Sequence, residues 1–76
     1  MPNDVHVAFG KVRLVVSSLR IDGQIDEESD YIAYASEIDG HGHSPPIRMT
    51  RPGSAAAALD LATRDSWVVE HSGISA

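Results

Sequence analysis

Cysteine is absent from this 76-residue chain, and only four of its residues are aromatic. The lack of cysteine excludes disulfide bonds, thiolate nucleophiles and cysteine-containing zinc sites, and it is consistent with a reducing compartment. No stretch reaches the roughly 20 apolar residues that a membrane-spanning helix needs, and the first residues lack the basic character of a signal peptide. We therefore expect a cytoplasmic protein without a membrane partner.

Lysine and arginine are absent from one long segment, Ile21 to Ile47, which holds seven of the eleven carboxylates. Like charges gathered in one segment must face either water or a cationic partner. With a net charge of −5, the chain itself should bind nucleic acid poorly, because such binding is driven by basic side chains. The segment favours a basic protein as partner, and the alternative is a set of acidic loops that only maintains solubility.

The apolar residues favour a sheet, because Val and Ile together number thirteen against four Leu. Apolar residues alternate from Val5 to Phe9 and again from Val12 to Val16, which predicts one strand or a hairpin. The apolar phase changes at Val15, so we expect either a bulge there or a strand whose two faces are both partly covered.

The middle of the chain predicts two further strands. Residues 24–30 have no pattern that could be buried and should form the exposed connection of a long hairpin. A strand follows from Tyr31 to Ile38, and Asp39-Gly40 is a strong turn signal. Two prolines then delay further pairing until about Ile47, where a short strand near a sheet edge should begin.

A run of four alanines predicts a helix from Ala55 to Arg64, with Ser54 as its N-cap. Its buried stripe should be Ala58, Leu61 and Ala62, while Asp60, Arg64 and Asp65 face water. Residues 66–70 are rich in β-branched and aromatic side chains and predict a final strand. The expected fold is thus a single α+β domain over residues 1–76, a small antiparallel sheet with one helix packed on it, in the order βββαβ, with frayed ends at about 1–4 and 72–76.

The larger aromatic residues are expected mainly in the core, with an interface as the alternative. These residues are Tyr31, Tyr34 and Trp67.

Chemical motifs are few. Asp39, His41 and His43 have a spacing that would place three possible Zn²⁺ or Ni²⁺ ligands on one side of a loop, and the alternative is a glycine-rich turn with solvated histidines. There is no nucleophile elbow and no phosphate-binding loop, so we expect no enzyme activity, no catalytic residue, no bound metal and no cofactor.

The run from Asp30 to Gly40 resembles the second-strand signature of HicB-like antitoxin domains, in which an acidic turn leads into a Tyr-Val-Ala-type strand. Ser36-Glu37-Ile38 stands where that family has proline-glutamate-leucine, and Ser54 followed by Ala58-Leu59 is similar to its helix cap and Ala-Leu pair. The resemblance covers roughly residues 12–67. It implies a three-stranded sheet, a helix and a further strand, and a role in binding a toxin.

Together these observations predict a small acidic, non-enzymatic regulator that binds and inhibits a basic, nucleic-acid-directed protein. An inhibitor encoded by a phage or other mobile element, such as an anti-CRISPR protein, is the alternative, and a small metal-binding domain using His41 and His43 is a further one. Because edge strands can pair with each other, a homodimer is also possible. The expected partner-binding residues are Asp22, Asp26, Glu27, Glu28, Asp30, Tyr31, Glu37 and Asp39.

Overall fold

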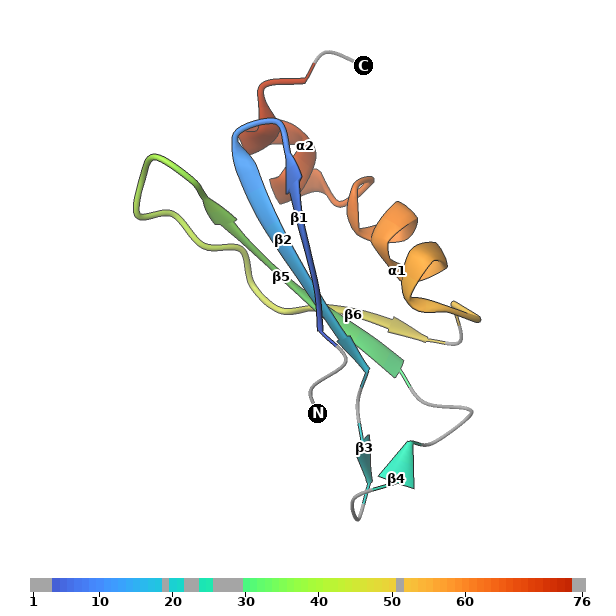
Figure 1. Cartoon of the computed structure of the whole chain (residues 1–76). Coiled ribbons are helices and arrows are strands. Elements are labelled where there is room, and N and C mark those ends of the chain that lie inside the picture. Colours follow the sequence, from blue (N-terminus) through green and yellow to red (C-terminus); the bar gives the residue numbers. More distant parts are fainter. Residues whose placement is uncertain (1–3, 19, 22–23, 26–29, 51, 75–76) are drawn as a thin grey trace.

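The chain folds into one four-stranded antiparallel sheet that carries two helices (Figure 1). A computed structural model describes residues 4–18, 20–21, 24–25, 30–50 and 52–74. The sheet has the order β1-β2-β5-β6, and a separate two-stranded unit is formed by β3 and β4. The strands are β1 (Val5–Phe9), β2 (Val12–Ser18), β3 (Arg20–Ile21), β4 (Gln24–Ile25), β5 (Asp30–Glu37) and β6 (Ile47–Thr50).

The first two strands form a hairpin, which settles the choice left open by the sequence. Phe9 pairs with Val12, so Gly10 and Lys11 alone make the turn. Gly10 has a φ of +60°, which a residue with a side chain rarely adopts. A side chain there would also collide with the carbonyl oxygen of Ser72. Glycine is therefore required at this turn for two separate reasons.

Strand β2 is the centre of the core. Its pairing with β1 and with β5 is continuous from Val12 to Val16, so the bulge expected near Val15 does not occur. Instead, both faces of the strand are covered to some extent, which is the second explanation for the change of apolar phase. Val12, Leu14 and Val16 are fully buried on one face, and Val15 is half-buried on the other. Each of these three side chains gains about 1.5–3 kcal/mol from burial, as an upper estimate.

Helix α1 (Ala55–Ala62) begins where the sequence predicted, with the Ser54 hydroxyl accepting a hydrogen bond from the Ala57 amide at 3.1 Å. It ends two residues before the predicted Arg64. Ala58 and Ala62 are fully buried, but Leu61 is 44% exposed, so its assignment to the buried stripe is wrong. Ala58 and Ala62, which are four residues apart, form the face that meets the sheet, and the half-buried Leu59 adjoins it. Leu61 lies to the side of this face.

The predicted final strand over residues 66–70 is wrong, because these residues form helix α2 (Ser66–Ser72). The Asp65 carboxylate caps it, accepting from the amides of Trp67 at 3.0 Å and Val68 at 3.4 Å. Gly73 ends it with a left-handed φ of +76°. The order βββαβ with a single helix is therefore replaced by strands followed by two helices, while the α+β class is confirmed.

The end of α2 lies inside the segment expected to fray. Ser72 is only 2% exposed, and its hydroxyl donates to the carbonyl of Val69 at 3.0 Å and accepts from the amide of Ile74 at 3.1 Å. Ser72 thus belongs to the last turn of α2.

Both helices cover the same face of the sheet (Figure 1). Helix α1 contacts β2, β5 and β6, and α2 contacts β2 and β5. The core between the layers consists of Val12, Leu14, Val16, Ala33, Ala35, Met49, Ala58, Ala62 and Val68. No helix among the described residues is both long and apolar enough to cross a bilayer.

Candidate protein-binding surfaces

The acidic segment does not form one continuous patch along the described residues. Asp30 is the first residue of β5 and Glu37 is the last, so the two lie at opposite ends of an eight-residue strand, about 23 Å apart. Asp39 continues from the Glu37 end and is exposed. Four of the predicted partner-binding residues lie outside the described residues, namely Asp22, Asp26, Glu27 and Glu28.

The β3–β4 unit is the part of the acidic segment that extends furthest from the sheet. Figure 1 shows these two short strands beyond the ends of β2 and β5, away from both helices. Arg20 pairs with Ile25, and Ile21 pairs with Gln24. The sequence predicted residues 24–30 as an exposed connection, whereas Gln24 and Ile25 form β4 and Asp30 begins β5. Residues 26–29 of that predicted connection lie outside the described residues.

Tyr31, the one aromatic residue among the predicted partner-binding residues, contributes to the core as well. It pairs with Met49 on β6, is half-buried and packs against the hydrophobic core. Tyr31 is thus partly accessible and also contributes to the packing of the core.

The loop from β5 to β6 is held closely against β5. The Glu37 amide donates to the carbonyl of Gly42 at 2.9 Å, and the Glu37 carboxylate occupies the space that a side chain at Gly42 would need. Ser44 is buried beyond it: its amide donates to the carbonyl of Ala35 at 2.8 Å, and its hydroxyl accepts from the Ala35 amide at 3.1 Å. This double contact fixes the path of the loop, which the sequence had predicted only as a turn.

The two loop histidines, His41 and His43, are both exposed. Over the ranges that the structure describes, no three His, Asp or Glu side chains come close enough together to hold a metal ion. Asp39 is exposed in the same loop, but it does not complete such a group there.

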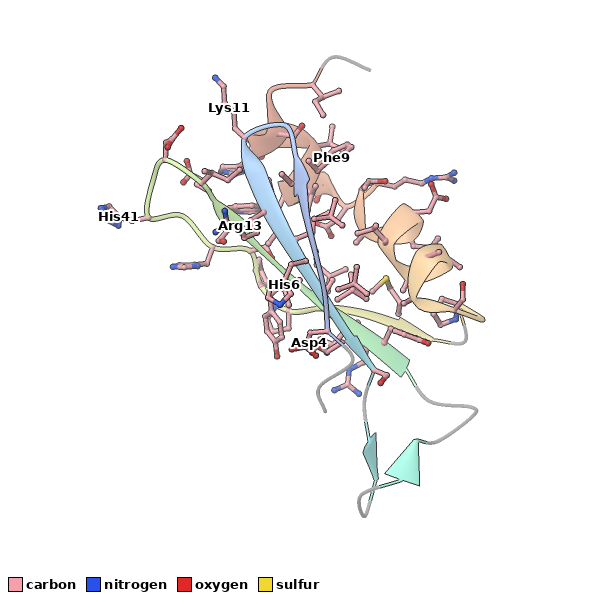
Figure 2. The ribbon with its side chains drawn as sticks, viewed as in Figure 1. Asp4, His6, Phe9, Lys11, Arg13 and His41 are labelled. Carbon is pink, nitrogen blue, oxygen red and sulfur yellow. The ribbon has the colours of Figure 1, made fainter. Side chains whose placement is uncertain are left out.

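The face of the sheet opposite the helices is a surface that the sequence analysis did not single out. Paired residues of an antiparallel sheet lie on the same face, so the pairings of His6 with Val15 and of Val15 with Tyr34 define a row across three strands. Figure 2 shows His6 and Arg13 on this side, away from α1 and α2. The described residues of the face are His6, Ala8, Arg13, Val15, Ser17, Ile32, Tyr34, Ser36 and Arg48.

Tyr34 on this face is 48% exposed, so its expected place in the core is wrong. The alternation of β5 contained the signal, because Tyr34 stands between Ala33 and Ala35, which point to the helices. Trp67, by contrast, is half-buried against the core, as predicted, and its ring stacks on that of His71 with 3.9 Å between centroids.

A hollow of about 290 Å³ lies between the end of the β5–β6 loop and α2. Two of its lining residues, Asp65 and Glu70, carry carboxylates, and none of the lining residues is basic. Trp67 lines it too, and a hollow lined by acidic residues and no basic one favours a Lys or Arg side chain. The lining residues are Pro45, Pro46, Ile47, Asp65, Ser66, Trp67 and Glu70.

Comparisons with known proteins found no relative of this chain. No family model, curated protein or solved structure matches the chain. The function is therefore argued from the surfaces themselves.

Proposed function

We propose that this protein is a small non-enzymatic regulator that binds and inhibits a basic, nucleic-acid-directed protein, in the manner of an antitoxin. The observation that carries the proposal is the segregation of charge: the segment from Ile21 to Ile47 has seven carboxylates and no Lys or Arg. A field of one sign speeds the encounter with a surface of the opposite sign.

Two regions are offered to the partner. The first is the acidic hairpin predicted from the sequence, to which β3 and β4 belong; its residues Asp22, Asp26, Glu27 and Glu28 lie outside the described residues. The second is the hollow beside α2, whose acidic lining residues Asp65 and Glu70 suit one basic side chain. The β5–β6 loop supplies Asp39 at one end and the prolines of the hollow at the other.

The resemblance to HicB-like antitoxin domains is one of sequence, because α2 stands where the family would have a further strand. The sequence motif favours the same chemistry, since a toxin that acts on nucleic acid needs a basic binding surface. A mobile-element inhibitor of a nucleic-acid channel would use this chemistry as well. The identity of the captured partner separates the two alternatives, because the first expects a toxin and the second a nucleoprotein effector.

The test compares proteins retained from a lysate of the source cells by the immobilised wild-type chain and by the double variant Glu27→Gln/Glu28→Gln. We expect the wild type to retain a high-pI, nucleic-acid-binding protein, and the variant to retain much less of it. The on-rate of the purified pair should fall as salt rises, and less steeply for the variant.

The matched control is Asp4→Asn/Asp60→Asn, which removes the same number of charges from outside the segment. Asp60 pairs with Arg64 on the surface, and an asparagine at position 4 keeps an acceptor for the Ser17 hydroxyl. Equal retention and equal salt slopes for the test and control variants would show that net charge, and not this segment, governs binding.

A further inference from the structure

Strand β1 forms one edge of the sheet and has β2 as its only neighbouring strand in the described structure. Its five residues, Val5 to Phe9, include no proline and no Lys, Arg, Asp or Glu. Neither helix lies over it in the way that both lie over β2 and β5. An exposed edge without these protective features is a template for pairing with another strand.

The opposite edge is protected. Strand β6 is only four residues long, carries an exposed Arg48, and is preceded by Pro45-Pro46 and followed by Pro52. Short length, charge and proline are the features by which proteins prevent strand addition. The contrast marks β1 as the edge that is available for pairing.

The register shows which backbone groups of β1 point outward. The Ile38 amide donates to the Lys11 carbonyl at 3.0 Å, so the odd-numbered residues of β2 hydrogen-bond toward β5 and the even-numbered ones toward β1. The β1 partners of those even-numbered residues are Val5, Val7 and Phe9. The amides and carbonyls of His6 and Ala8 therefore point to the open edge, where none of the described residues bonds to them.

We propose that β1 pairs with β1 of a second copy of this chain, antiparallel and with Val7 on the two-fold axis. In that register His6 of each copy faces Ala8 of the other, and these are the residues whose backbone groups point outward. The two pairs exchange four hydrogen bonds, and the two Val7 residues form the non-hydrogen-bonded pair between them. The two four-stranded sheets become one continuous sheet of eight strands.

The strand is complementary to itself in side chains as well. Val5 faces Phe9 of the other copy and Val7 faces Val7, so three half-buried apolar residues from each chain adjoin on the helix side. His6 faces Ala8, which keeps the two histidines apart. Beyond the strand, Asp4 lies at one end of β1 and Lys11 at the other, so an antiparallel pair brings opposite charges together at both ends (Figure 2).

A cysteine cross-link tests the register, since the native chain has no cysteine. The Cα atoms of a non-hydrogen-bonded pair lie about 4.5 Å apart, within the range for a disulfide, so Val7→Cys should cross-link rapidly to a covalent dimer in air. His6→Cys is the matched control, because its two Cα atoms would be about 8 Å apart, beyond the disulfide limit. Cross-linking of the His6 variant as fast as that of the Val7 variant would overturn the proposed register.

Sedimentation equilibrium tests the dimer itself. The wild type should show twice the chain mass of 8.1 kDa, and Ala8→Pro should weaken the dimer about tenfold or more, because it removes two of the four hydrogen bonds. Circular dichroism should show that Ala8→Pro stays folded, since the lost amide faces outward and not toward β2. A monomeric wild type would refute the proposal, and so would a folded Ala8→Pro variant that dimerises as tightly as the wild type. If Ala8→Pro unfolds, the comparison of cross-linking in the Val7 and His6 variants tests the proposal.

Discussion

The amide of Lys11 donates a hydrogen bond to the carbonyl of Ser72 at 2.9 Å. This bond joins the turn of the first hairpin to the last turn of α2. The approach is so close that the neighbouring Gly10 has no room for a side chain. It also holds the end of α2 at the hairpin, where Gly73 caps the helix beside the Lys11 side chain.

Gly10→Ala should therefore destabilise the protein by more than the strain of a positive φ alone. That strain amounts to about 1–3 kcal/mol, and the collision with the Ser72 carbonyl adds to it. Chemical denaturation measures the loss. Gly53→Ala is the control, since Gly53 has a φ of +90° but nothing within 4 Å of an added side chain. An equal decrease in the free energy of unfolding for the two variants would show that the collision with Ser72 does not contribute to the destabilisation.

Ala58→Asp should cost several kcal/mol and unfold a domain of this size, because it would place an unpaired carboxylate in the core. Leu61→Asp in the same helix should have a much smaller effect, since Leu61 is 44% exposed. Thermal unfolding of the two variants measures the difference. Similar melting curves for both would mean that α1 presents another face to the sheet.

Asp65→Ala should lower the free energy of unfolding by about 1 kcal/mol, because it removes the acceptor for two amides at the start of α2. Asp60→Ala removes a carboxylate that pairs with the exposed Arg64 and should change stability by only a few tenths of a kcal/mol. Urea denaturation of the two variants provides the comparison. An Asp65 variant as stable as the Asp60 variant would argue against the cap.

Ser44→Ala should release the β5–β6 loop. The substitution leaves the Ala35 amide without its hydroxyl acceptor, at a cost of about 1–3 kcal/mol for a buried donor. Amide hydrogen exchange at Ala35 should accelerate, while exchange at Leu14 in the centre of the sheet should change only in proportion to global stability. Unchanged protection at Ala35 would show that another group accepts its hydrogen bond.

His41→Ala/His43→Ala should leave the melting temperature within about a degree of the wild type, since both side chains are exposed in the loop. Elemental analysis of the purified protein tests the metal-binding alternative directly. Stoichiometric Zn²⁺ or Ni²⁺ that disappears in the double variant would support that alternative and displace the regulator proposal.

The strands were largely predictable because local patterns determine them. The alternation from Val5 to Val16, the turn signal at Asp39-Gly40 and the prolines before Ile47 each act over a few residues. The N-cap of α1 at Ser54 was equally local. Such signals predict where an element begins without knowledge of its neighbours.

The second helix was not predictable in the same way. Val68-Val69 favours a strand by propensity, but Val68 is buried against the sheet and Val69 is 39% exposed, as in a helix that packs on one side. Asp65 and Gly73 are local signals for the two ends of a helix, and tertiary packing decided between a strand and a helix. Tyr34 and Leu61 were misplaced for a related reason, because which side of an element is covered depends on where both helices lie.

The bond between Lys11 and Ser72 also constrains how the protein can be made in the cell. The two residues lie far apart in the sequence, so this contact forms only after the segment that contains α2 has left the ribosome. The hairpin of β1 and β2 is synthesised earlier, and its apolar face lacks the cover of the helices until then. A chain that terminates before α2 would therefore leave exposed the apolar surface of β2 and β5 that α2 covers in the complete fold, and such a chain should aggregate more readily.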